Sequence, residues 1–168
     1  KVLSSTNDSM LLGATFQEIG VVYYLMGKSD SATFYLRKSL SYPYKQDDYS
    51  IRTYVFADYW FNTEKYDSAY FYADKALKYP SNFFTKRECY RILANTSYLQ
   101  GDYKGAEIAL GQYVIESHGD PTGLLAYTRA LLFLGQTKEA LAILQSFPAS
   151  PEYQTAQKLR TLAEALVE

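Results

Sequence analysis

The sequence predicts an all-α protein in which helix-turn-helix hairpins stack into an α-α superhelix that ends in a C-terminal capping helix. Three observations lead to this fold class. Two sixteen-residue segments are closely similar, a small residue recurs at nearly constant intervals, and apolar residues follow helical spacing. A chain of 168 residues can bury a core without a metal or disulfide, so we expect one domain over residues 1–168.

Two similar segments show the period of the repeat. Residues 28–43 read KSDSATFYLRKSLSYP and residues 65–80 read KYDSAYFYADKALKYP, so the two agree at ten positions and lie 37 residues apart. Alanine holds the same place in four phrases, with steps of 37, 37 and 34 residues between Ala32, Ala69, Ala106 and Ala140. Small side chains mark the points where paired helices approach to about 8–10 Å. The facing positions are Gly20, Ala57, Ala94 and Thr128.

The first unit indicates how each hairpin is built. Three- and four-residue spacing places one set of side chains on a single helix face, namely Phe16, Ile19, Gly20, Tyr23 and Met26. After a break at Gly27 the spacing resumes in a second helix, which Pro43 stops, at Ala32, Tyr35, Leu36, Ser39 and Leu40. One such pair cannot bury its apolar stripe alone, but stacked pairs can, and about three are needed for stability.

Each unit carries a common set of motif residues. They are Phe16, Ile19, Gly20, Tyr23, Ala32, Leu36 and Pro43; Phe56, Ala57, Trp60, Ala69, Ala73, Ala76 and Pro80; Tyr90, Leu93, Ala94, Gly101, Asp102, Tyr103 and Ala106; and Leu124, Tyr127, Gly135 and Ala140. This set resembles the tetratricopeptide repeat, a pattern of about 34 residues. The resemblance implies a right-handed solenoid with repeats at about residues 13–43, 50–80, 87–117 and 121–148. Thr53, Ser97 and Thr128 depart from the pattern, and the 37-residue steps exceed its period by close to one helical turn.

The tail, residues 151–168, continues the helical pattern. Its apolar face contains Tyr153, Ala156, Leu159, Leu162, Ala163 and Leu166, with Gln154, Lys158, Arg160 and Glu164 mostly opposite. We interpret the tail as a capping helix or as the first helix of a fifth unit.

Composition restricts the partners. With 17 basic and 18 acidic residues the net charge is −1, so we expect no nucleic-acid partner. No apolar run reaches the roughly 18 residues of a membrane span, and residues 1–15 lack the order of a signal peptide, so we expect no direct membrane contact. The start at Lys1 suggests a piece of a longer polypeptide. The 18 Tyr and 9 Phe suit a chain that faces both a core and a partner.

Few residues could carry out catalysis or hold a metal. Cys89 and His118 are the only thiol and imidazole, and we interpret Cys89 as buried and inert. Glu116, His118 and Asp120 belong to a turn-rich segment that we interpret as a solvated loop. No glycine-rich phosphate loop follows a strand. We therefore expect no enzymatic activity, no catalytic residues, no metal and no cofactor.

The resemblance implies that the first helix of each pair lines a concave groove. The non-motif residues of these helices are Gln17, Val21, Tyr24, Tyr54, Asp58, Phe61, Asn62, Arg91, Asn95, Tyr98, Leu125, Arg129 and Leu132. Aromatic side chains interspersed with charges suit peptide capture, because interface energy concentrates in Tyr, Trp and Arg.

Two interpretations stay open for part of this set. Arg91 and Asn95 resemble half of the clamp by which some members of the family hold a C-terminal carboxylate, although the next helix supplies only Arg129. Arg91 could instead pair with Asp58 across the neighbouring helix. The aromatic residues at one recurring position fit either a core or a groove; they are Tyr24, Phe61 and Tyr98.

We hypothesise a non-enzymatic interaction module whose groove binds a peptide or helix of a partner protein. The main alternative is a regulatory or sensory segment in the extracytoplasmic part of a membrane-anchored bacterial protein, because Tyr-rich, slightly long repeats look similar to such domains. A helical hydrolase or transferase and a helical-repeat RNA binder are further alternatives.

Overall fold

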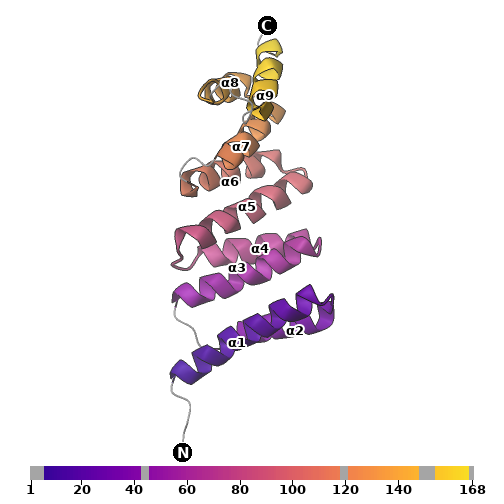
Figure 1. Ribbon diagram of the computed structural model, residues 1–168, viewed down its shortest axis with the longest axis vertical. Helices are drawn as coiled ribbons and strands as arrows, with labels where there is room; N and C mark the ends of the chain where they lie inside the picture. The colour runs from indigo at the N-terminus through magenta and orange to yellow at the C-terminus, as the bar shows by residue number, and fades with distance from the viewer. Residues whose placement is uncertain (1–5, 43–45, 118–120, 148–153, 167–168) are drawn as a thin grey trace, which may run out of the picture.

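A computed structural model of the chain describes residues 6–42, 46–117, 121–147 and 154–166. Within these residues the protein is all-helical, as predicted, with nine helices and no strand (Figure 1). The helices are α1 (Thr6–Leu25), α2 (Ser29–Ser39), α3 (Gln46–Asn62), α4 (Tyr66–Leu77), α5 (Phe83–Leu99), α6 (Tyr103–Glu116), α7 (Pro121–Phe133), α8 (Thr137–Gln145) and α9 (Gln154–Ala165).

The helices pack in chain order. Each helix contacts the next one along the chain, and α1 also packs on α3, α3 on α5 and α7 on α9. Figure 1 shows the pairs stacked from α1 and α2 at the bottom to α9 at the top, with α2 and α4 partly behind α1 and α3. The stack therefore brings the first helices of the pairs side by side in its lower half.

The small residues lie where helices approach closely, as expected. All four recurring alanines are fully buried, and so are three of the facing residues, Ala57, Ala94 and Thr128. A Cβ atom on the fourth, Gly20, would come within 2.7 Å of Leu36 Cγ, which leaves no room for a side chain. Thr128 fits because its Oγ1 donates a hydrogen bond to the Leu124 carbonyl oxygen at 2.8 Å.

The core is divided along the stack into three hydrophobic clusters. One surrounds Leu36 and Phe56 between α1, α2 and α3, and the second surrounds Ile92 between α3, α4, α5 and α6. The third surrounds Leu144 between α7, α8 and α9. This division follows from stacking, because each pair buries its apolar stripe only against its neighbours.

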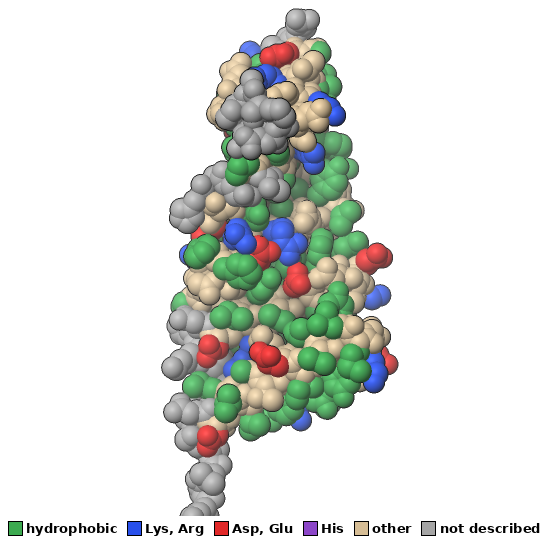
Figure 2. Space-filling model, in the orientation of Figure 1, with side chains coloured by type: hydrophobic (Ala, Val, Ile, Leu, Met, Phe, Trp, Pro, Cys, Tyr) green, Lys and Arg blue, Asp and Glu red, His purple; other side chains and the backbone are tan. Residues whose placement is uncertain are grey.

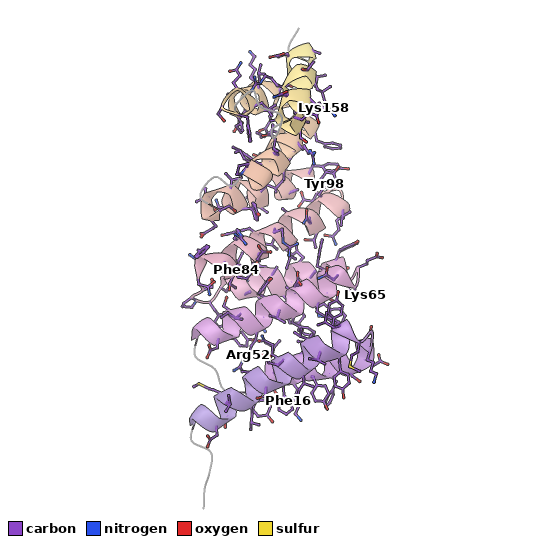
Figure 3. All side chains as sticks on the ribbon, viewed as in Figure 1. Phe16, Arg52, Lys65, Phe84, Tyr98 and Lys158 are labelled. Atoms are coloured by element: carbon purple, nitrogen blue, oxygen red, sulfur yellow. The ribbon has the colours of Figure 1, made fainter. Side chains whose placement is uncertain are left out.

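Arg52 of α3 is a buried guanidinium that the sequence did not point to. It lies between α1 and α3 (Figure 3), where Nη2 donates to the Met10 carbonyl oxygen at 2.8 Å and Nη1 to the Ser39 carbonyl oxygen at 3.2 Å. Burial lowers the pKa of Arg52, and Asp48 partly opposes that shift. A Cβ atom on Gly13 would collide with this guanidinium, so Gly13 gives Arg52 its space.

Helix α9 is held against the end of α8 by Arg160, a residue that the sequence predicted to lie mostly on the polar face of α9. Arg160 Nη2 donates to the carbonyl oxygens of Leu144 at 2.6 Å and Phe147 at 3.0 Å, which ties α9 to the end of α8 and to the segment that follows it. On the apolar face, Ala156 and Ala163 are buried, but Leu162 and Leu166 stay half-exposed. Pro43, Pro151 and Tyr153 lie outside the described residues.

No helix in the described part of the chain is both long enough and apolar enough to cross a bilayer.

Candidate functional site

A band of charged and aromatic side chains joins α3 to α5. We call it the α3–α5 face; its members are Tyr54, Asp58, Phe61, Phe84, Arg87, Glu88 and Arg91. At mid-height in Figure 2, basic and acidic side chains gather among hydrophobic ones. The two helices pack directly on each other, so these side chains form one continuous surface.

Four of these residues form a chain of ion pairs. Arg91 Nη2 lies 3.0 Å from Asp58 Oδ1, and Arg91 Nε lies 2.7 Å from Glu88 Oε2. The other Glu88 oxygen, Oε1, lies 2.9 Å from Arg87 Nη2. Asp58 Oδ2 accepts a hydrogen bond from Asn62 Nδ2 at 3.0 Å. These contacts hold the charges in fixed positions, which limits the side-chain entropy that binding would cost.

The network stabilises the charged form of Arg91 against the cost of its partial burial. Desolvation alone would lower the pKa of Arg91, but the hydrogen bond and charge of Glu88, with a contribution from Asp58, raise it above its usual value. Of the two interpretations of Arg91, the structure favours pairing with Asp58. The guanidinium contacts the carboxylates of Asp58 and Glu88 on its two sides.

Aromatic rings flank the ion pairs on both sides. The guanidinium carbon of Arg91 lies 5.8 Å from the Phe61 ring centroid, and that of Arg87 lies 5.3 Å from the Phe84 centroid. The Tyr54 and Phe84 rings meet edge to face at 6.1 Å. Cation–π and edge contacts of this kind orient the rings, so the apolar part of the surface is as ordered as its charged part.

Tyr54 supplies a hydrogen-bond donor at the centre of this face. Burial, followed by the negative charges of Asp58 and Glu88, raises the pKa of Tyr54 to about 12. The hydroxyl therefore stays protonated over the whole physiological range. It has no hydrogen-bond partner within the described residues, so it can donate to an incoming group.

The remaining predicted groove residues lie elsewhere. Gln17 lines a separate cavity between α1 and α3 with Asp48 and Arg52. Tyr24 packs edge to face on the buried Tyr59 with ring centroids 5.4 Å apart. The hydrophobic clusters include Val21 and Leu125. A second cavity, between α5, α7 and α9, is lined by Asn95, Tyr98, Arg129 and Leu132.

The recurring aromatic position has different surroundings along the stack. Tyr24 and Phe61 are half-buried and pack against core clusters, whereas Tyr98 is half-exposed. Tyr24 therefore serves the core. Of the three residues at this recurring position, Phe61 and Tyr98 contribute to open surfaces.

Of the other candidate reactive groups, Cys89 and Glu116 lie within the described residues. Cys89 is fully buried, and desolvation raises the pKa of its thiol to about 12, so it stays protonated at neutral pH. His118 and Asp120 lie outside the described residues. Among those that are described, no cluster of His, Cys, Asp or Glu could hold a metal ion.

Sequence reasoning missed Phe84, Arg87 and Glu88. The Glu88–Arg91 spacing of three residues was an available signal, because it places opposite charges side by side on a helix. The sequence offers the Arg91–Asp58 pair as one interpretation, but the position of Phe84 and Arg87 beside Tyr54 and Asp58 depends on how α5 is rotated against α3, which the pattern of a single helix does not contain.

A comparison of the chain with protein-family models and with curated protein sequences finds no match.

Proposed function

We propose that the chain is a non-enzymatic protein-interaction module, a right-handed solenoid of tetratricopeptide-like hairpins that binds an extended peptide or a helix of a partner protein. The observation that carries the proposal is the α3–α5 face. It combines pre-positioned charges, two flanking rings and the free Tyr54 hydroxyl on adjacent helices. Such a surface fits the anatomy of an interface hot spot, in which aromatic and arginine anchors are held in place before binding.

The charge balance of this face favours a polypeptide over a nucleic acid. Both arginines are matched by the carboxylates of Asp58 and Glu88, so no excess positive charge remains to release counterions from a phosphate backbone. A partner gains instead from apolar contact with Phe84 and from a hydrogen bond with Tyr54. The fixed charges then select the register of the peptide and reject mismatched sequences.

Selection from a displayed library of random peptides about twelve residues long tests this proposal, since an extended peptide of that length can span both helices of the face. Peptides that bind the wild type are measured against Phe84→Ala, Tyr54→Phe and the control Phe71→Ala. Phe84 and Phe71 are comparably exposed, at 46% and 58%, but Phe71 lies on α4 outside the α3–α5 face. We expect Phe84→Ala to weaken binding about tenfold or more and Tyr54→Phe about fivefold.

The control distinguishes specific binding at the α3–α5 face from nonspecific binding to any exposed aromatic ring. Phe71→Ala should leave the affinity unchanged. Equal losses in Phe84→Ala and Phe71→Ala, or a library that yields no peptide sensitive to the α3–α5 face, would exclude this face as the binding site.

A further inference from the structure

The second open site is a cavity of about 620 Å³ between α5, α7 and α9, which we call the α5–α9 cavity. It arises from an interruption in the stack. The backbones of the first helices α1, α3 and α5 approach one another closely, but within the described residues those of α5 and α7 do not, and side chains such as Tyr98 and Phe133 bridge the wider gap. Side chains of α6 and α9 line further sides of this space, which leaves an open hollow rather than a packed interface.

Large apolar side chains line this cavity without filling it. Tyr98 and Phe133 are 49% and 56% exposed on one side, and Leu162 and Leu166 are 52% and 57% exposed on the side formed by α9 and the residue that follows it. Hydrophobic side chains cover the right-hand edge of Figure 2 at the height of α5 to α7. Leaving this much apolar surface open costs free energy that a ligand would recover.

The aromatic wall is held in place by ring contacts among three helices. Phe133 of α7 lies 4.1 Å from Tyr103 of α6 and 6.1 Å from Tyr98 of α5, measured between ring centroids. Tyr98, labelled in Figure 3, lies towards the end of α5 away from Phe84. The cavity is therefore separate from the α3–α5 face, and its wall is ordered before any ligand enters.

The polar groups at this cavity carry a single uncompensated charge. Arg129 and Asn95 line it, and no described Asp or Glu does. Unlike Arg87 and Arg91, Arg129 makes no ion pair with any described residue. A guanidinium beside an apolar hollow is complementary to a carboxylate, which it can bind through two parallel hydrogen bonds.

We propose that the α5–α9 cavity binds a small amphiphile of the fatty-acid class, in which an apolar body carries one carboxylate. The carboxylate binds Arg129 and Asn95, and the apolar body lies between the aromatic wall and the leucines of α9. The volume supports a small molecule, because cavities of roughly 300–1,000 Å³ with apolar walls and few polar groups are typical of such ligands. This site does not depend on peptide binding at the α3–α5 face.

Calorimetric titration with hexanoate, octanoate and decanoate, below their micelle-forming concentrations, tests the proposal. Each added methylene should strengthen binding about fourfold until the cavity is full. Octan-1-ol has the same tail without the charge and should bind roughly tenfold more weakly than octanoate. A single saturable site is expected in each titration.

Two substitutions in the cavity test the contributions of its charge and of its apolar wall separately. Arg129→Gln should remove the preference for octanoate over octan-1-ol, and Leu162→Gln should weaken both ligands. Lys158→Gln is the matched control, since Lys158 is an exposed cation on α9 that does not line the cavity. Thermal unfolding of each variant checks that the fold is retained.

Several results would overturn this inference. They are equal affinity of the wild type for acid and alcohol, an unchanged preference in Arg129→Gln, and the absence of saturable binding. Tighter binding of an apolar peptide with a free C-terminal carboxylate, lost in Arg129→Gln, would assign the cavity to a polypeptide end instead. Phe84→Ala should leave octanoate binding intact, so failure here is distinguishable from failure of the proposed peptide site.

Discussion

At the scale of single residues, Glu64 has a backbone conformation that glycine has in the other three hairpin turns. Its φ is 60°, and the equivalent Gly27, Gly101 and Gly135 have φ values of 71°, 80° and 74°. A side chain in this left-handed region costs about 1 kcal/mol or more, a strain that glycine avoids. We expect Glu64→Gly to raise the free energy of unfolding by about 1 kcal/mol, measured by urea denaturation.

The reverse change in the next hairpin is the control. Gly101 has open space where a Cβ atom would lie, so Gly101→Ala tests backbone strain without a clash. It should lower the free energy of unfolding by about 1 kcal/mol. A Glu64→Gly protein less stable than the wild type would show that the Glu64 side chain contributes more than its strained backbone costs.

Cys89 links stability to pH at the same scale. Its pKa is about 12 in the folded protein, against 9.0 for an ordinary thiol, because burial disfavours the thiolate. A raised pKa contributes stability that is fully present below pH 9 and is lost as the pH rises towards 12. Relative to Cys89→Ala, the wild type should lose about 1.4 kcal/mol per pH unit above about pH 9.

Denaturation of the wild type and of Cys89→Ala between about pH 8 and about pH 10.5 measures this difference. The contributions of the tyrosines and lysines, which titrate in both proteins, cancel in the comparison. Parallel stability curves would show that the Cys89 thiol ionises as easily in the folded chain as in the unfolded one.

At the scale of helices, Arg52 and Gly13 together make a contact between α3 and α1: the guanidinium of Arg52 packs where Gly13 has no side chain. Gly13→Ala places a methyl group against the guanidinium and should cost about 1–3 kcal/mol. In an Arg52→Ala background that clash is absent, so the same change should be neutral or stabilising, since alanine favours a helix. Unfolding free energies of the two single variants and the double variant give the coupling between the sites.

Gly111→Ala in α6 provides the reference for helix propensity alone, because its new methyl group would meet only Tyr127 at 3.9 Å. It should stabilise by about 0.5–1 kcal/mol. Additive effects of Gly13→Ala and Arg52→Ala would contradict the contact between these two sites.

The helices themselves could be predicted from sequence, but the buried polar contacts between them could not. Apolar spacing and the recurring alanines locate the hairpins and their close approaches, because each depends on one helix or one adjacent pair. Arg52 and Arg160 resemble ordinary surface charges in the sequence. Their partners are backbone carbonyl oxygens of Met10, Leu144 and Phe147, and no side-chain pattern encodes those.

At the scale of the molecule, the candidate site shows the same limit. A regular repeat predicts one groove along all the first helices, yet the structure divides the predicted residues among several places. Asp58 and Arg91 meet because α3 packs closely on α5, whereas Tyr98 and Arg129 line an open cavity because the backbones of α5 and α7 stay further apart within the described residues. The spacing between stacked pairs depends on all side chains at each interface, and the repeat period does not determine it.

The same interruption predicts that the stack unfolds in parts. The helices α7, α8 and α9 share a separate hydrophobic cluster and are joined to the rest mainly through α6, so they can open while α1 to α5 stay folded.

Two fully buried residues test this division by hydrogen exchange. Leu131 lies in α7 and Ile92 in α5, and truncation of either to alanine should cost about 2–5 kcal/mol. Leu131→Ala should speed amide exchange in α7, α8 and α9 and leave α3 and α4 protected. Ile92→Ala should speed exchange in α3, α4 and α6 as well, because α5 packs on all three. Equal loss of protection in α3 and α8 after Leu131→Ala would instead show that the whole stack unfolds as one cooperative unit.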